Sequence, residues 1–106
     1  MAFRLIVSLL VLGAFALAGC SSDHEHGEVQ IHGNTYDPGT LTVQAGQEVH
    51  FVNHDGVAHT ATSDTGAFDT GNIAGGATGD ARFDGPGTFS YHCKIHPSMK
   101  GTIVVQ

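Results

Sequence analysis

A short run near the C-terminus of the chain combines three side chains that bind soft metal ions. Cys93, His96 and Met99 lie three residues apart in the segment 91–101, YHCKIHPSMKG. A thiolate, a thioether and two imidazoles are the ligands of trigonal copper sites, whereas zinc and iron–sulfur sites require further thiolates or imidazoles. The run therefore predicts three ligands of a copper site and requires a second His from another part of the chain.

Short β-strands are expected to position this run, because apolar residues alternate with polar ones along most of the chain. Clusters of Gly, Pro, Asn and Asp separate the alternating segments, as turns separate strands. We therefore expect an all-β fold, an antiparallel Greek-key β-sandwich of about seven strands. The pattern does not decide whether residues 66–79 form a strand, a helical turn or a loop. The alternating pairs are Val29 and Ile31, Leu41 and Val43, Val49 and Phe51, Ala81 and Phe83, Phe89 and Tyr91, and Ile103 and Val105.

Strand parity predicts where the thiolate lies. If Phe89 and Tyr91 face the core, Cys93 faces the core as well, while Ser90 and His92 face solvent. A thiolate at the inner edge of a sandwich is costly unless a metal ion neutralises it. Burial and metal ligation of Cys93 are therefore consistent with each other.

The chain contains eight His residues from which the missing ligand can come. His59 is the candidate that combines a strand start with apolar neighbours, in the segment GVAHT at 56–60. We expect exposed strand or turn positions for the three residues His32, His50 and His54. His24 and His26 lie in a polar N-terminal segment, and they are either a solvated tether or a second, weaker copper-binding patch.

The N-terminal residues have the pattern of a secretory signal. Residues 1–19 have a basic start and an apolar run, and the segment LAGC, which ends at Cys20, resembles the bacterial lipobox. We therefore expect a signal peptide at 1–19, a tether at 20–28 beginning with a lipidated Cys20, and a folded domain at 29–106. The protein is then extracytoplasmic and lipid-anchored to the cell membrane, on its periplasmic or outer face. The alternatives are that Cys20 is an ordinary residue of the signal or forms a disulfide with Cys93.

Length and charge narrow the class of protein further. A chain of 106 residues forms one small domain, too small to enclose a large catalytic pocket. Its formal net charge of −6 has the wrong sign for nucleic-acid binding. We expect a monomer that binds no nucleic acid.

Four segments of the chain together resemble the cupredoxins, and most of all plastocyanin and amicyanin. The resemblance covers about residues 29–106, and the Cys-x-x-His-x-x-Met spacing is similar to the short ligand loop of amicyanin. It implies one type 1 copper ion with His59, Cys93 and His96 as equatorial ligands and Met99 as the axial ligand. It also implies that hydrogen bonds of Asn53 tie the two ligand loops together. The segments are 38–46, 49–60, 68–71 and 85–101.

The resemblance implies a one-electron carrier that cycles between Cu(I) and Cu(II), with His96 as the surface port. Its partner would be a c-type cytochrome or an oxidase domain, bound transiently and steered by charge. One alternative is a copper-binding or delivery lipoprotein without electron transfer. Another is an enzyme fragment, because His92 directly precedes Cys93 as in copper nitrite reductases and multicopper oxidases. Those enzymes need several such domains, so we expect no enzymatic activity.

Overall fold

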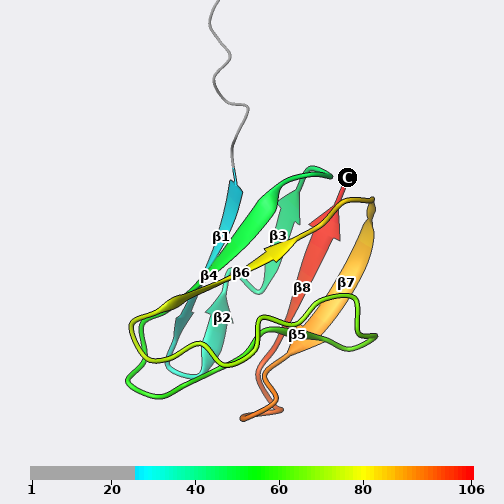
Figure 1. Cartoon of the computed structure of the whole chain (residues 1–106). Helices are drawn as coiled ribbons and strands as arrows, with labels where there is room; N and C mark the ends of the chain where they lie inside the picture. Colours follow the sequence, from blue (N-terminus) through cyan, green and yellow to red (C-terminus); the bar gives the residue numbers. More distant parts are fainter. Residues whose placement is uncertain (1–25) are drawn as a thin grey trace, which may run out of the picture.

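Eight β-strands make up the regular structure of residues 26–106, the part of the chain that the computed structural model describes. They are β1 (His26–His32), β2 (Thr35–Asp37), β3 (Thr40–Val43), β4 (Glu48–Asn53), β5 (Thr62–Ser63), β6 (Thr78–Arg82), β7 (Gly87–His92) and β8 (Lys100–Val105). Two four-stranded sheets result, in the orders β2-β1-β4-β6 and β3-β8-β7-β5 (Figure 1). The predicted all-β sandwich is confirmed.

Both sheets are mixed, whereas the sequence predicted antiparallel sheets. β1 pairs with β4 in parallel, as β3 does with β8, and the other neighbouring strands are antiparallel. Parallel neighbours need a crossover connection. Here the chain leaves β1 through β2, contributes β3 to the second sheet and returns as β4 beside β1. Periodicity reports which face of a strand is buried but not the direction of its neighbour.

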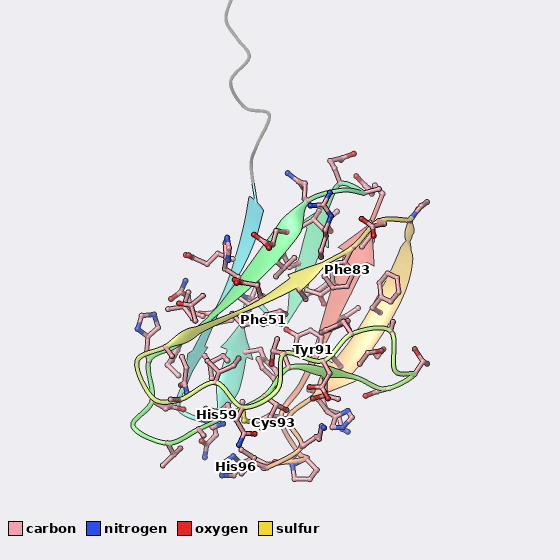
Figure 2. All side chains as sticks on the ribbon, in the orientation of Figure 1. Phe51, His59, Phe83, Tyr91, Cys93 and His96 are labelled. Atoms are coloured by element: carbon pink, nitrogen blue, oxygen red, sulfur yellow. The ribbon has the colours of Figure 1, made fainter. Side chains whose placement is uncertain are left out.

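The core lies between the sheets and follows the predicted alternation. Phe51 and Tyr91 project from opposite sheets, and their ring centroids lie 5.5 Å apart (Figure 2). Phe68 extends this aromatic cluster, with centroids 6.3 Å from Phe51 and 5.0 Å from Phe83. Phe68 belongs to residues 66–79, whose structure the sequence did not predict. These residues form a loop up to the start of β6, and isolated β-bridges pair this loop with the segment before it. Buried aromatic area therefore fixes this loop against the core.

The parity of β7 is as predicted. Tyr91 and Cys93 are buried, whereas Ser90 is exposed and His92 is partly exposed. Tyr91 also requires the glycine opposite it, because a Cβ on Gly101 would lie 2.4 Å from Tyr91 Cζ. The strand that precedes the predicted copper loop is thus locked in one register.

β1 begins at the end of the sandwich opposite to the loops that carry His59 and Cys93 (Figures 1 and 2). Its first residue, His26, lies within the range predicted as tether, and it is already in register with Glu48 of β4. The predicted signal peptide, Cys20 and His24 lie outside the described residues. Within residues 26–106, no helix is long and apolar enough to cross a membrane.

Candidate metal centre

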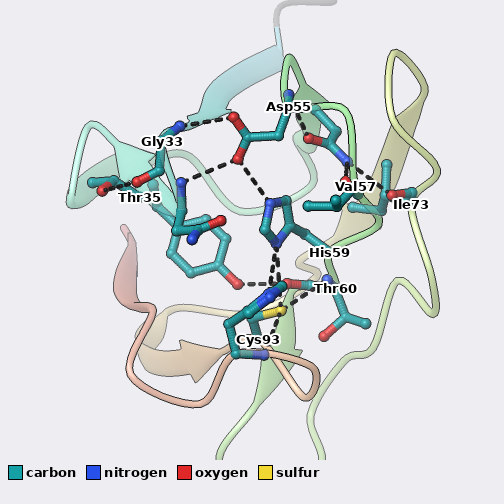
Figure 3. Close-up of polar contacts among 12 residues, drawn as sticks. Gly33, Thr35, Asp55, Val57, His59, Thr60, Ile73 and Cys93 are labelled. Atoms are coloured by element: carbon teal, nitrogen blue, oxygen red, sulfur yellow. Dashed lines mark hydrogen bonds and ion pairs between the residues drawn. The ribbon is translucent and has the colours of Figure 1, made fainter.

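Residues 53–60, which follow β4, form the first ligand loop, and Asn53 holds its base. Asn53 is fully buried, and its amide nitrogen donates to the carbonyls of Val57 at 2.8 Å and Ile73 at 2.9 Å. Its side-chain oxygen accepts the Asp55 amide at 2.9 Å (Figure 3). These bonds satisfy buried backbone groups that would otherwise be costly. The side chain thereby fixes the path of the chain toward His59.

His59 is held from two sides. Its backbone exchanges hydrogen bonds with Ile73, at 3.1 and 2.7 Å, and its ring is fully buried. Its Nε2 lies 2.8 Å from Asp55 Oδ2. Because a carboxylate only accepts, Nε2 carries the ring proton and the lone pair is on Nδ1. The ring therefore presents Nδ1 as a metal ligand.

Asp55 is itself anchored by the turn between β1 and β2. The amides of Gly33 and Asn34 donate to its two carboxylate oxygens at 2.8 and 3.1 Å (Figure 3). The amides of Asn34 and Gly33 lower the pKa of Asp55 most, the His59 ring lowers it less, and the result is a pKa of about 2. The carboxylate is thus ionised at neutral pH and remains an acceptor for His59.

Residues 93–99 form the second ligand loop, which directly follows β7 and closes on itself. The Cys93 amide donates to the Met99 carbonyl at 3.2 Å, and the Met99 amide donates to the His96 carbonyl at 2.9 Å. The loop is compact because its residues satisfy one another's backbone groups. It buries Cys93 and Met99 and leaves His96 half-buried at the surface.

The Cys93 sulfur accepts amide hydrogen bonds from both loops. The Thr60 amide lies 3.3 Å and the His96 amide 3.4 Å from Sγ. Burial raises the pKa of Cys93, but these amides and the His59 ring lower it, and the balance is about 6. The side chain is therefore poised as a thiolate, the form that binds metals.

Three ligand atoms converge between the loops (Figure 2). His59 Nδ1 lies 3.8 Å from Cys93 Sγ and 3.3 Å from His96 Nδ1, and all the ligand atoms of this trio lie within 4.8 Å of one another. Two imidazole nitrogens and one thiolate around a common point suit a transition-metal ion. The buried Met99 adds a thioether on the same loop, so the donor set fits copper better than zinc.

Comparison with known proteins agrees with this geometry. The family of the cupredoxin-like domain matches residues 5–105. The chain belongs to this family. A plastocyanin from Scenedesmus fuscus is 33% identical over an alignment 84 positions long, which covers 67% of this chain and 86% of the plastocyanin. Amicyanin-alpha from Methylorubrum extorquens is 29% identical over an alignment 84 positions long, which covers 74% of this chain and 71% of that protein.

Solved structures of amicyanin variants have the same fold as this cupredoxin. One, of a reduced variant, superposes with a TM-score of 0.72 at 25% identity, over 81% of this chain and 86% of that chain. Another, titled as the Cu(I) form of a variant, has the same TM-score, identity and coverage.

The structure brings together the predicted ligands His59, Cys93 and His96. Asn53 is buried as expected for a supporting residue, but its side-chain bonds join the first ligand loop to residues 73–74. The link between the two ligand loops runs instead through Thr60, whose amide reaches Cys93 and whose hydroxyl accepts the Lys94 amide at 2.9 Å. Sequence reasoning missed Thr60; its position directly after His59 was the available signal.

The remaining described His residues lie away from this cupredoxin's metal centre. His92 Nδ1 lies 2.6 Å from Asp64 Oδ1 on the outer side of β7, so the imidazole that suggested an enzyme fragment is hydrogen-bonded to a carboxylate. His32 and His54 are exposed, as predicted. His50 is only a quarter exposed, because carboxylates flank it.

Proposed function

We propose that this cupredoxin is a type 1 copper protein that carries one electron at a time between partners outside the cytoplasm. The convergence of His59 Nδ1, Cys93 Sγ and His96 Nδ1 within 4.8 Å supports this function most directly. His59, Cys93 and His96 would be the equatorial ligands and Met99 the axial one. The bound copper ion would supply the Cu(I)/Cu(II) couple.

The protein's own contribution is to keep the ligands in place while the charge of the site changes. Asp55 holds the His59 ring, and the amides of Thr60 and His96 stabilise negative charge on Cys93. Fixed dipoles around a buried site need little rearrangement when charge moves. This arrangement favours fast electron exchange over binding and release of the ion.

His96 is the proposed port for electrons, because it is the ligand that reaches the surface. Val57 and Ile95, from the first and second ligand loops, are the large apolar residues exposed in the described chain, at 52% and 45%. Exposed apolar side chains on the two ligand loops suit a brief encounter with a redox partner. The net charge of −6 favours a partner with a basic face, such as a c-type cytochrome or an oxidase domain.

Location and assembly form part of the same proposal. The signal-like sequence of residues 1–19 and the lipobox around Cys20 support export and lipid anchoring to the membrane. We propose a monomer without enzymatic activity or nucleic-acid partner. The hydrogen bond between His92 and Asp64 supports the absence of enzymatic activity, and the acidic net charge supports the absence of a nucleic-acid partner.

The decisive experiment is a copper titration of residues 21–106, in which Cys93 is the sole cysteine. Cu(II) should produce an intense blue absorption band and a reversible redox potential. Cys93→Ser should lose the band and His32→Ala, remote from the centre, should keep it. Colourless, readily exchanging Cu(I) would favour copper delivery instead, and a blue band that survives in Cys93→Ser would refute the proposed site.

A further inference from the structure

A second group of metal-binding side chains lies on the outer face of the first sheet. Glu48 and His50 occupy alternate positions of β4, so their side chains share one face, and Asp80 of β6 is directly opposite His50. The ligand atoms of these three residues all lie within 4.8 Å of one another. None of the three belongs to the ligand loops described above.

The His50 ring lies between two carboxylates. Its Nδ1 contacts Asp80 Oδ1, and its Nε2 lies 3.7 Å from Glu48 Oε1. A neutral imidazole carries a single N–H, and carboxylates only accept, so a neutral ring can donate to just one of them. An ion bound at one ring nitrogen leaves the N–H on the other, so the ring can ligate an ion and still donate to a carboxylate.

The surroundings add negative charge to this face. Glu28 of β1 is in register with His50 on the side away from Asp80, and His26 is in register with Glu48. Arg82 is directly opposite Glu48, but its Nε lies 3.1 Å from Asp84 Oδ1, so the Asp84 carboxylate offsets its charge. Clustered carboxylates beside an imidazole attract a cation from solution.

We propose that Glu48, His50 and Asp80 form a surface site for a divalent transition-metal ion, Cu(II) or Zn(II). One imidazole and two carboxylates provide nitrogen and oxygen ligands, which suit these ions, and the absence of sulfur from this trio disfavours Cu(I). Cu(II) binds more tightly than Zn(II) at such a site. The side chains are partly exposed, at 25% for His50 and about half for the carboxylates, so the bound ion exchanges with solvent.

This site is separate from the buried centre in both place and chemistry. Asn53, at the base of the first ligand loop, lies three positions after His50 along β4, a distance of about 10 Å. The buried centre offers a thiolate, whereas the surface site does not. Cu(II) bound at the surface therefore contributes a paramagnetic signal without an intense blue band.

The test is a calorimetric titration of the full chain with Zn(II), comparing wild type with His50→Gln and Asp80→Asn. Loss of a group that merely supports a ligand typically costs 10–100-fold in affinity, so loss of the imidazole should weaken this site at least about tenfold. The matched control is His32→Gln, because His32 is also an exposed His beside a single carboxylate, Asp37, at 3.4 Å.

The expected result is one Zn(II) fewer per chain, or at least about tenfold weaker binding at one site, in His50→Gln and Asp80→Asn but not in His32→Gln. This difference is measurable whether or not the buried centre also takes up Zn(II). Circular dichroism verifies that each variant is folded. Unchanged Zn(II) binding in His50→Gln, or an equal loss in His32→Gln, would overturn the proposal. A second equivalent of Cu(II) should add a paramagnetic signal that is absent from His50→Gln.

Discussion

The two ligand loops of this cupredoxin are held in different ways. The first, residues 53–60, is fastened by side chains that bind other parts of the fold, through Asn53 to Ile73 and through Asp55 to Gly33. The second, residues 93–99, is closed by its own backbone and by the strands on either side of it. One loop depends on long-range polar contacts and the other on local closure.

This difference is reflected in the two imidazoles. His59 is fully buried and its ring is fixed by Asp55, whereas His96 is half-buried and its ring contacts the ring of His59. A fixed ligand keeps the geometry of the centre, and a ligand near the surface gives access to a partner. The first loop thereby fixes the geometry of the metal centre, and the second gives a partner access to it.

Breaking the base of the first loop should have the largest effect. Asn53→Ala removes the side-chain donor to the carbonyls of Val57 and Ile73 and the acceptor of the Asp55 amide, so we expect the free energy of unfolding to fall by roughly 2–4 kcal/mol. Urea unfolding of the metal-free protein measures this loss. Asn72→Ala, at an exposed position, should change stability little. Equal losses in the two variants would contradict the role given to Asn53.

The second loop should be sensitive to packing rather than to side-chain hydrogen bonds. Gly101→Ala places a methyl group against the Tyr91 ring just beyond the loop, and such overpacking typically costs roughly 1–3 kcal/mol. Thermal and urea unfolding should show this loss. Gly39→Ala, where a Cβ meets nothing within 4 Å, is the matched control. If both variants are as stable as wild type, Tyr91 can shift more easily than the packing implies.

The link between the loops can be cut by removing one hydroxyl. Thr60→Val keeps the shape of the side chain and the amide that reaches Cys93, but it removes the acceptor of the Lys94 amide. We expect a loss of about 1 kcal/mol in the free energy of unfolding. Thr42→Val, on the exposed face of β3, should be close to neutral. A neutral Thr60→Val would show that the loops are held independently.

The smallest perturbation is the titration of Cys93, because it reports on both loops without altering either. Its pKa of about 6 in the metal-free protein results from burial, which raises it, and from amide donors in both loops, which lower it more. The ultraviolet absorbance of the thiolate should therefore appear as the pH rises through about 6. A midpoint at the ordinary cysteine value of about 8.5 would show that the amides do not converge on the sulfur in solution.

Local sequence patterns predicted the ligands of both loops, but not the contacts that hold the first loop in place. Cys93, His96 and Met99 are close in sequence, and strand parity alone placed Cys93 in the core. The support of His59 by Asp55 depends on a turn more than twenty residues earlier, and periodicity gives no sign of it. For the same reason the parallel pairing of β1 with β4, which aligns Glu28 with His50, was not foreseen.

The entry of β1 at the end of the sandwich away from the ligand loops determines how the domain would stand on a surface. A seven-residue strand spans about 23 Å. A chain fastened at its N-terminal side, whether to a lipid bilayer or to an electrode, would therefore hold His96 on the side turned away from the point of attachment. A partner could approach that side without competing with whatever holds the protein in place.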